Sequence, residues 1–219
     1  MRWEKWRHTL KARYPRTVFP TARSLLIRRS LERLDLSRFT SVLVVGAGKD
    51  PYRRLFGTPR RYITLDIVDR PGYIDVIADA HAIPFADATF DCVFAAEVVE
   101  HLSNPLRFSA EAHRVLVAGG QLILTVPFLF HMHDDPRDYW RFTADGLREL
   151  LKNFETVDVI SQGNRLHVLS DLITSAFGPV PFLLPLRGLN HLLRLSLGGD
   201  LKDSNSSAPS GFLVFARKH

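Results

Sequence analysis

Short apolar runs rich in Val, Ile, Leu and Phe alternate along this chain with segments in which apolar residues recur at helical spacing. The runs cover residues 42–45, 61–65, 73–77, 90–96, 120–127, 155–161 and 211–216. Runs of this length predict strands, and strands that alternate with helices are typical of a doubly wound parallel sheet. We therefore expect an α/β fold with a mostly parallel, seven-stranded sheet whose last strand is antiparallel.

Two further segments predict helical additions to this sheet. Residues 1–39 form helical pieces interrupted by Pro15 and Pro20, and we expect them to be a basic helical cap on a domain of residues 40–219. Residues 165–199 are strongly apolar and predict a helical insertion before the last strand. Prolines divide it into pieces shorter than the ~20 apolar residues that a spanning helix needs. A lid over a pocket, a contact with a membrane surface and a dimer contact are all compatible with this insertion.

The first strand ends in a glycine turn that is typical of ligand-binding α/β sheets. Val45 is followed by Gly46-Ala47-Gly48, where residues without a Cβ let the backbone turn sharply and approach a ligand closely. Asp66 follows about twenty residues later, at the end of the second strand, where nucleotide-binding sheets place the acid that binds ribose hydroxyls. The third glycine of the dinucleotide fingerprint is missing, since Asp50 and Pro51 stand there. A plain tight turn is therefore the alternative interpretation.

Four motifs occur in an order and spacing that resemble one large family of enzymes. They are VLVVGAGKD, YITLD, IADAHAIPFADATFDCVFAAEVVEHLSNP and EAHRVLVAGGQLILTVPF. Together they resemble the class I, Rossmann-like S-adenosylmethionine-dependent methyltransferases of the methyltransferase 11 type, over roughly residues 40–160. The resemblance implies that residues 40–219 are a Rossmann-like methyltransferase domain and that S-adenosyl-L-methionine is the cofactor.

The resemblance also implies which residues of this chain hold the cofactor. The matching positions are Gly46, Gly48, Asp66, Asp79, Ala80 and Glu97. In the family pattern the glycines pass under the methionine and ribose parts, and Asp66 binds the ribose hydroxyls. Asp79 receives the adenine amino group, Ala80 contacts the ring through its backbone, and Glu97 lies beside the methionine moiety.

This chain departs from the family pattern at two positions. Val44 stands where the family has an acid that helps to hold the ammonium group of the cofactor, and Asp50 replaces the third glycine. We expect Glu97 or Asp50 to bind the ammonium group instead. The alternative is that the chain binds the cofactor weakly, as a module without turnover.

A dense polar segment, PFLFHMHDDPRDYWRFT, follows the fifth strand at residues 127–143. Ligands of open α/β sheets bind outside the carboxyl ends of the strands, so this segment is expected to cover the acceptor site. We expect Tyr139, Trp140 and Arg141 to contact the acceptor. The string resembles those of family members associated with sugar and surface-polysaccharide biosynthesis, which implies a hydroxyl acceptor.

Histidines in and near this segment are the candidate catalytic bases. Methyl transfer to oxygen requires that the acceptor be aligned and lose a proton, and a histidine with a near-neutral pKa is a natural proton acceptor. We assign this role to His133 and His101, with His131 and Asp135 as supporting candidates. His101 also matches the histidine of the Glu-His pair that is common in the family. Alternatively, these histidines only orient the loop by hydrogen bonding.

The same segment raises the question of a metal ion. His131 and His133 share one face of an extended segment and have aspartates close by in the sequence. Magnesium-dependent O-methyltransferases of this fold, however, use mostly carboxylate ligands. Arg137 and Arg141 are expected to pair with the aspartates or with an anionic acceptor, so we assign no metal.

The positive charge of this 219-residue chain is concentrated at its N-terminus. Residues 1–38 carry eleven Lys or Arg against three acidic residues, a net charge of +8, so the total of +6 leaves −2 for the remainder. Such an arm favours contact with nucleic acid, an anionic membrane surface or an anionic substrate, unless it is only a solvated helix. The single cysteine, Cys92, forms no intrachain disulfide. We expect a cytoplasmic protein, with contact at a membrane surface as a second expectation.

These features predict an S-adenosylmethionine-dependent methyltransferase for a small or lipid-linked acceptor, with a hydroxyl of a sugar or related metabolite as the target. The alternatives are a methyltransferase of nucleic acid or another macromolecule that uses the basic arm, and the inactive module. Ala95-Ala96-Glu97 lacks the Pro-Pro-aromatic string of enzymes that methylate amino groups of DNA, which argues against a nucleic-acid partner. The missing third glycine argues against a nicotinamide oxidoreductase.

Overall fold

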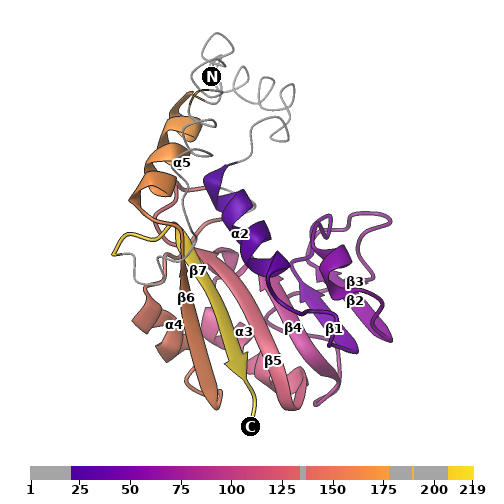
Figure 1. Ribbon diagram of the computed structural model, residues 1–219. Helices are drawn as coiled ribbons and strands as arrows, with labels where there is room; N and C mark the ends of the chain where they lie inside the picture. Colours follow the sequence, from indigo (N-terminus) through magenta and orange to yellow (C-terminus); the bar gives the residue numbers. More distant parts are fainter. Residues whose placement is uncertain (1–20, 134–136, 178–188, 190–206) are drawn as a thin grey trace.

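The structure, a computed structural model, describes residues 21–133, 137–177, 189 and 207–219. Figure 1 draws the remaining residues as a thin grey trace. Asp135, residues 1–20 of the predicted cap and most of the predicted insertion after Phe177 lie outside the described residues. The predictions that concern them stay predictions.

Within the described residues, seven strands form one sheet (Figure 1). They are β1 (Ser41–Val45), β2 (Arg61–Asp66), β3 (Val76–Ile77), β4 (Phe90–Ala96), β5 (Leu116–Pro127), β6 (Thr156–Gln162) and β7 (Gly211–Arg217). Their order across the sheet is β3-β2-β1-β4-β5-β7-β6. Neighbours from β3 to β5 are parallel, whereas β7 runs antiparallel to β5 and β6. The expected mostly parallel, seven-stranded α/β fold is confirmed.

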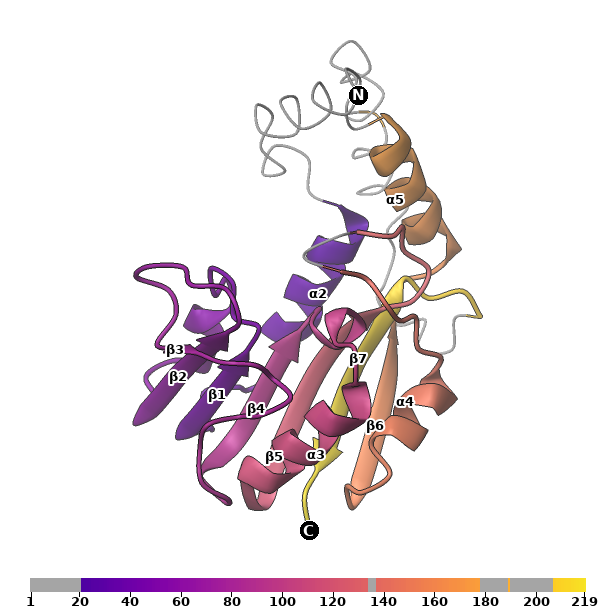
Figure 2. The same cartoon turned by 180° about the vertical axis from the view of Figure 1, so that it is seen from behind.

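Helices cover both faces of the sheet, as the buried central strands require. On one face, α3 (Pro105–Val115) and α4 (Ala144–Leu150) pack on an apolar core (Figure 2). On the opposite face, α2 (Ala22–Glu32) and the 3-10 helix η1 (Arg53–Phe56) cover a second core (Figure 1). The continuous apolar sequences of β1 and β4 follow from this arrangement, because each of these strands is buried from both sides.

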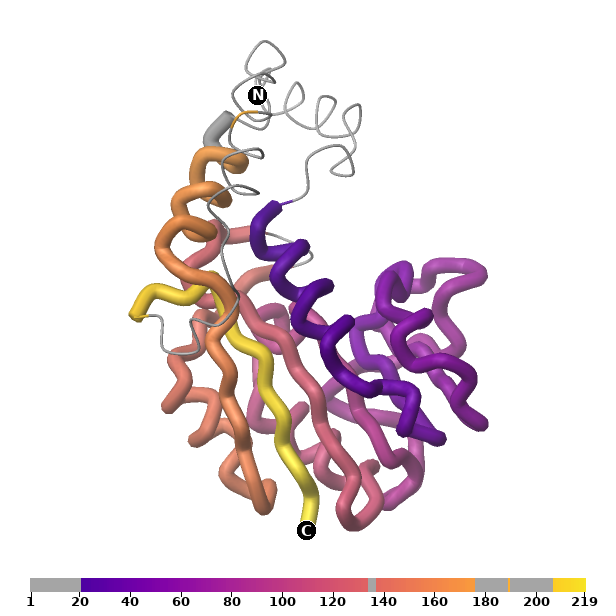
Figure 3. The backbone as a smooth tube through the Cα atoms, in the orientation of Figure 1, coloured from indigo at the N-terminus to yellow at the C-terminus, as the bar shows by residue number. Residues whose placement is uncertain are grey.

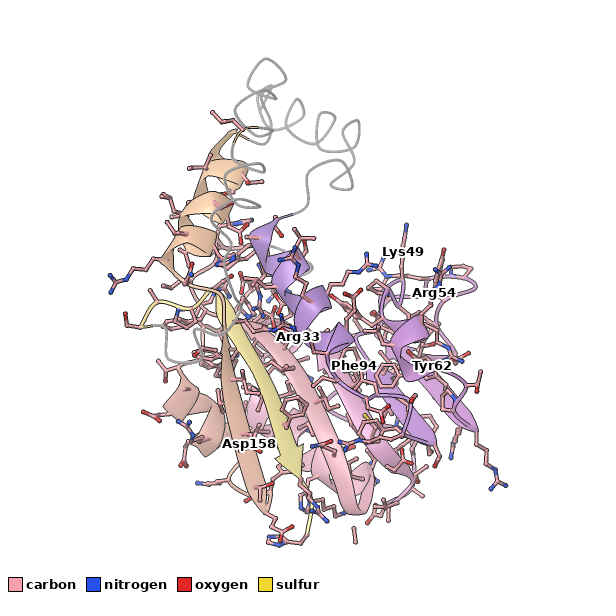
Figure 4. The ribbon with its side chains drawn as sticks, in the orientation of Figure 1. Arg33, Lys49, Arg54, Tyr62, Phe94 and Asp158 are labelled. Atoms are coloured by element: carbon pink, nitrogen blue, oxygen red, sulfur yellow. The ribbon has the colours of Figure 1, made fainter. Side chains whose placement is uncertain are left out.

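Aromatic rings fill the space between η1 and the sheet. Phe56 of η1 meets Tyr62 of β2 and Phe94 of β4 edge to face, with ring centroids 5.6 and 5.4 Å apart. Figure 4 labels Tyr62 and Phe94 below η1. The guanidinium of Arg53 lies over the Tyr62 ring, 3.9 Å from its centroid. These contacts fix the segment that follows the glycine turn of β1.

The N-terminus of α2 is bound by a residue from far along the chain. The carboxylate of Asp171, in helix α5 (Arg165–Phe177), accepts hydrogen bonds from the backbone N–H groups of Ala22 and Arg23, at 2.5 and 2.9 Å. A negative charge at this end of a helix is favourable, because the first N–H groups have no partner within the helix. Asp171 therefore joins α5 to the start of α2, and Figure 3 shows that end of α2 (indigo) beside α5 (orange).

Helix α5 turns its polar side inward. Among the side chains of α5 that the structure describes, those of His167, Ser170, Asp171 and Thr174 are buried. Leu166, Leu169 and Leu172 on its other side are 52, 53 and 51 % exposed. Leu166 and Leu169, which the sequence places on the apolar stripe of the predicted insertion, therefore do not pack on α2. None of the described helices is long and apolar enough to cross a bilayer.

Two predicted strand boundaries are wrong. The fifth strand begins at Leu116, ahead of the two glycines, because Leu116 pairs with Phe90 and Gly119 N donates to the carbonyl of Lys218 at 3.1 Å. The third strand is reduced to Val76–Ile77, since a turn precedes it in which Tyr73 N donates to the carbonyl of Arg70 at 2.9 Å. In both cases backbone groups are satisfied by partners that the local pattern does not reveal.

Candidate active site

The order of the strands reverses between β1 and β4. From β1 the chain continues to β2 and β3 on one side, while β4 and β5 lie on the other side. In open α/β sheets such a reversal leaves a crevice outside the carboxyl ends of the two strands, and ligands bind there. We call this side of the sheet the carboxyl edge; α5 rises from it in Figure 1. The predicted cofactor and acceptor residues that are described follow β1 to β5 at this edge.

The two glycines after β1 serve different purposes. Both have a positive φ, 63° at Gly46 and 60° at Gly48. A Cβ on Gly46 would lie 2.5 Å from a methyl group of Val98, so this glycine lets the end of β1 lie against the segment after β4. A Cβ on Gly48 would meet nothing within 4 Å. Gly48 therefore faces open space of the kind that a cofactor in close contact with the backbone requires.

Asp66 is buried at the end of β2 and organises the glycine turn. Its Oδ2 accepts a hydrogen bond from Gly48 N and its Oδ1 accepts one from Val68 N, both at 2.9 Å. Each carboxylate oxygen has two lone pairs, so each can accept one further hydrogen bond. The arrangement fits the predicted role of Asp66 in binding two neighbouring ribose hydroxyls.

Contacts with His81 stabilise the ionised form of Asp79. Its Oδ1 accepts hydrogen bonds from His81 N at 2.9 Å and from His81 Nδ1 at 2.6 Å. The backbone N–H of His81 is the main cause of the lowered pKa of Asp79. Because Asn104 N donates to His81 Nε2 at 3.2 Å, the neutral ring carries its proton on Nδ1. The ionised, half-exposed carboxylate of Asp79 suits an adenine amino group, and Ala80 beside it is buried.

Asp50 and Val44, the two positions that depart from the family pattern, both make contacts within the protein. The carboxylate of Asp50 accepts a hydrogen bond from the Tyr62 hydroxyl, at 2.9 Å to Oδ2. Burial raises the pKa of Asp50. Val44, which replaces the acid of the family pattern, is buried in the core beneath α2. Lys49, in the same turn as Asp50, points away from the sheet (Figure 4).

Glu97 follows β4 with a positive φ of 55° and is held by a buried arginine. Arg23 of α2, 2 % exposed, places Nη2 at 2.5 Å from Glu97 Oε1 and Nε at 3.1 Å from Oε2. The Thr125 hydroxyl donates to Oε1 at 3.1 Å. Arg23 also donates to Gln162 Oε1 at 2.7 Å and to the carbonyl of Val126 at 2.8 Å. The N-terminal helix therefore fixes a carboxylate of the predicted cofactor site.

A second carboxylate, Glu100, lies among the predicted catalytic histidines. Its side chain is 0 % exposed, with Oε1 at 3.7 Å from His101 Nε2 and 3.8 Å from His133 Nε2. The two imidazole rings meet edge to face, with centroids 4.8 Å apart. Burial, and then the nearby charge of Glu97, raise the pKa of Glu100 well above its ordinary value. The structure thus brings His101 and His133 together, as expected, around a carboxylate that the sequence analysis did not select.

The loop that carries His133 is held by an ion pair. Arg141 donates to both carboxylate oxygens of Asp138, at 2.5 and 2.7 Å, and His133 N donates to Asp138 Oδ2 at 2.9 Å. Burial opposes ionisation of Asp138, but these hydrogen bonds lower its pKa to about 2. The expected pairing of Arg141 with an aspartate is confirmed. His131 lies in the same loop, with its ring centroid 6.4 Å from that of His133.

Tyr139 and Trp140 lie next to the Glu100 cluster with exposed rings. Their backbone N–H groups donate to the Glu100 carbonyl, at 2.8 and 3.3 Å, and Trp140 Nε1 donates to the carbonyl of Leu102 at 2.8 Å. These bonds fasten the polar loop to the segment after β4. The rings are accessible to an acceptor, as their predicted role requires.

The sequence analysis missed Arg23, Glu100 and His81. Arg23 gave a usable signal, because it lies among the apolar positions Ala22, Leu26 and Ile27 of one helix face, where an unpaired charge is costly. The only sequence signal for Glu100 was its position before His101. Its burial could not be predicted, because it depends on the loop of residues 137–143.

Comparisons with known proteins match the part of the chain that forms the central strands. Residues 43–124 match the methyltransferase domain of the methyltransferase 11 type. An uncharacterized 37.1 kDa protein in a transposon of Streptomyces fradiae is 37% identical over 51 residues, 23% of this chain and 15% of that protein. An uncharacterized protein of Methanocaldococcus jannaschii is 27% identical over 124 residues, 54% of this chain and 60% of that protein. The chain thus spans less than two thirds of either relative.

Solved structures share the fold at low sequence identity. The crystal structure of an S-adenosylmethionine-dependent methyltransferase from Archaeoglobus fulgidus superposes with a TM-score of 0.58 and 15% identity. The superposition covers 90% of this chain and 95% of that one. Residues 43–124 thus match the methyltransferase domain of the methyltransferase 11 type, a family whose cofactor is S-adenosylmethionine, and the sheet shares the fold of the solved methyltransferase structure.

Proposed function

We propose that this chain transfers the methyl group of S-adenosylmethionine to a hydroxyl group of a small or lipid-linked acceptor, a sugar or a related metabolite. The observation that carries the proposal is the meeting of Glu100, His101 and His133 beside the exposed rings of Tyr139 and Trp140. A transferase that acts on oxygen needs a group that takes up the hydroxyl proton, and this cluster offers one.

The described residues fit the cofactor. Open space over Gly48 accommodates a close backbone contact, and Asp66 retains lone pairs for ribose hydroxyls. The ionised carboxylate of Asp79 is suited to the adenine amino group. When bound, S-adenosylmethionine supplies an electrophilic methyl group on a positively charged sulfur, which departs as a neutral thioether.

Glu97 is our candidate for the ammonium group of the cofactor. Asp50 is bound to the Tyr62 hydroxyl, and Val44 is buried in the core, so neither offers a carboxylate at this point. The Glu97 side chain is held by Arg23 and remains 22 % exposed. A partly exposed carboxylate that is fixed in position can accept a charged hydrogen bond without a large loss of side-chain entropy.

His133 is our candidate for the proton acceptor. Burial, and then the neighbouring His101, lower the pKa of His133, so its ring is neutral at pH 7 and can accept a proton. Asp138 and Arg141 hold the loop on which His133 lies. The acceptor oxygen forms its bond to carbon as its proton passes to the ring, and the exposed aromatic rings provide apolar surface on which a sugar can rest.

The proposal is tested by a transfer assay with labelled methyl donor on the purified full chain. The acceptors are nucleotide-activated sugars, lipid-linked sugars and free glycans, and NMR of the product locates the new methyl group. We expect a methoxy signal. In His133→Asn we expect cofactor affinity to be retained and kcat to fall by about 10²–10⁴-fold. His113→Asn, which replaces a histidine packed against Phe154 outside the site, is the matched control.

Two results would contradict this function. A product methylated on nitrogen or carbon would show that the acceptor is not a hydroxyl group. Tight binding of the cofactor without transfer to any acceptor class would favour the inactive module instead.

A further inference from the structure

Three side chains at the carboxyl edge have the chemistry and the spacing of metal ligands. They are Glu100, His101 and His133, and the ligand atoms that they offer lie within 4.8 Å of one another. We propose that they bind a divalent transition-metal cation, and that this cation activates the acceptor hydroxyl. The second part rests on the proposed O-methylation, whereas the binding site itself does not.

The Glu100 carboxylate is the first argument. It is 0 % exposed, and in the described part of the chain neither of its oxygens has a hydrogen-bond partner. A buried carboxyl group without a hydrogen-bond partner is costly in either protonation state, and buried charged groups in proteins are paired or coordinate metals. The nearby arginines are engaged elsewhere, since Arg23 is bound to Glu97 and Arg141 to Asp138. A cation between Glu100 and the histidines would satisfy the carboxylate.

The orientation of the histidines is the second argument. His101 Nδ1 is bound to the carbonyl of Arg137, which can only accept, so Nδ1 carries the proton. His133 Nδ1 likewise faces acceptors, the carbonyl of His131 at 3.4 Å and Asp138 Oδ2 at 3.5 Å. Both Nε2 atoms are therefore left with a lone pair toward Glu100. Metal-bound histidines have this pattern, in which a carbonyl or carboxylate holds one nitrogen while the other coordinates.

The distances between Glu100 Oε1 and the two histidine Nε2 atoms favour a cation between them. At 3.7 and 3.8 Å the separations from Glu100 Oε1 to the two Nε2 atoms are too long for hydrogen bonds. Glu100 Oε1 and the two Nε2 atoms face one another without a hydrogen bond between them. Metal–ligand bonds of about 2.0–2.2 Å place neighbouring ligand atoms roughly 3.0–3.5 Å apart. Modest side-chain rotation closes the observed set onto a cation.

The ligand set also indicates the class of cation and its role. Two imidazoles and one carboxylate suit zinc, iron, manganese or cobalt better than magnesium or calcium, whose ligands are mostly oxygens. Three protein ligands leave coordination positions for water or the acceptor, and the two histidine side chains are partly exposed. A cation there lowers the pKa of a bound hydroxyl, whose proton is then lost to water, so that His133 acts as a ligand in place of its role as the proton acceptor.

This proposal replaces the sequence-based assignment of no metal. That assignment considered His131 and His133 together with aspartates of the same loop. In the structure Asp138 is bound by Arg141, and the carboxylate that faces His133 Nε2 is Glu100, from the segment after β4. Glu100 and His101 follow β4 whereas His133 follows β5, so spacing within one segment could not predict the cluster.

The test is metal binding by the chelator-stripped full chain. Calorimetric titrations with Zn²⁺ and Mn²⁺, and the absorption spectrum of a Co²⁺ titration, are compared for the wild type, Glu100→Gln and His133→Asn. We expect saturable binding to the wild type and a loss of affinity of more than tenfold in both variants. Glu149→Gln, which removes an exposed carboxylate paired with Lys152, is the control and should bind as the wild type does. Circular dichroism confirms that each variant is folded.

Two outcomes would overturn the metal site, and each is separable from failure of the methyltransferase function. One is an absence of saturable binding, and the other is equal affinity in the wild type, Glu100→Gln and His133→Asn. If labelled methyl transfer proceeds at full rate with excess chelator, the cation has no role in activation and His133 acts directly as the base. If metal binds as expected and no acceptor is methylated, the metal site stands and the proposed function fails.

Discussion

The guanidinium of Arg23 in α2 donates two hydrogen bonds to the carboxylate of Glu97 after β4, with Nη2 2.5 Å from Oε1 and Nε 3.1 Å from Oε2. This contact joins the N-terminal helix to the site where the cofactor is expected. The helix was predicted as a cap on the sheet domain, yet it supplies a residue that orients a carboxylate of the candidate active site. Asp171 secures the arrangement, because it binds the first N–H groups of the same helix.

We expect Arg23→Gln to lower both stability and cofactor affinity. Removing one partner of a buried ion pair typically costs about 3–5 kcal/mol, and the partial exposure of Glu97 places this pair at the lower end. Urea unfolding measures the stability and calorimetry with S-adenosylhomocysteine measures the affinity. Arg28→Gln is the matched control: Arg28 pairs with Glu32 on the exposed side of α2, so its replacement should leave stability nearly unchanged. Equal losses in the two variants would contradict a special role for Arg23.

We expect Asp66→Asn to weaken cofactor binding by about 10–100-fold. The carboxylate holds Gly48 N and Val68 N, and hydrogen bonds to a charged group are worth about 1.5–3 kcal/mol. The control is Asp91→Asn. Asp91 accepts hydrogen bonds from Thr40 N and Ser41 N, at 2.8 and 3.0 Å, at the start of β1. Asp91→Asn should reduce stability and leave calorimetric cofactor affinity unchanged, so a shared loss of affinity would argue against the Asp66 assignment.

The sequence predicted the parts of this site that lie within one segment. Continuous apolar runs revealed the buried strands, and the glycine turn with Asp66 followed from its spacing. Contacts between distant segments could not be predicted from such patterns. Arg23 and Glu97 are separated by 74 positions in the sequence. Glu100 meets His133 only because the loop of residues 137–143 folds back onto the segment after β4. No local period encodes such contacts.

The orientation of α5 illustrates the same limit. Leu166 and Leu169 recur at helical spacing and gave the apolar signal, but they are exposed in the structure. The helix instead buries Asp171, whose hydrogen bonds to the start of α2 fix its rotation. Burial of a hydrogen-bonded carboxylate therefore overrode the apolar pattern.

The two glycines of the turn should respond differently to alanine. Gly46→Ala brings a Cβ to 2.5 Å from Val98, so we expect a stability loss larger than the 1–2 kcal/mol that a left-handed φ costs an alanine. Gly48→Ala has space for its Cβ and should cost only about that amount, while occupying room that the cofactor needs. Urea unfolding and cofactor calorimetry separate the two effects. Adding Val98→Ala should recover part of the loss in Gly46→Ala and none in Gly48→Ala; the reverse pattern would contradict the packing role of Gly46.

Glu111 provides a pH-dependent contribution to stability outside the site. It accepts hydrogen bonds from Arg114, at 2.8 and 2.9 Å, and from Ile83 N at 2.8 Å. The hydrogen bond from Arg114 is the main cause of the lowered pKa of Glu111. A lowered pKa means that the unfolded chain binds the proton more readily. The stabilisation is therefore complete above the unfolded value of about 4.3 and is lost as the pH falls through the lower, folded value.

We accordingly expect Glu111→Gln to lose about 1 kcal/mol of unfolding free energy at pH 7, with the difference from the wild type shrinking steadily below about pH 4. Urea unfolding of both proteins between pH 3 and 7 measures it. Glu149→Gln is the control, because its exposed pair with Lys152 should give little difference at any pH in this range. If the difference in unfolding free energy between Glu111→Gln and the wild type stays constant from pH 7 to pH 3, the loss comes from the packing of the amide. Ionisation of Glu111 would then contribute nothing to stability.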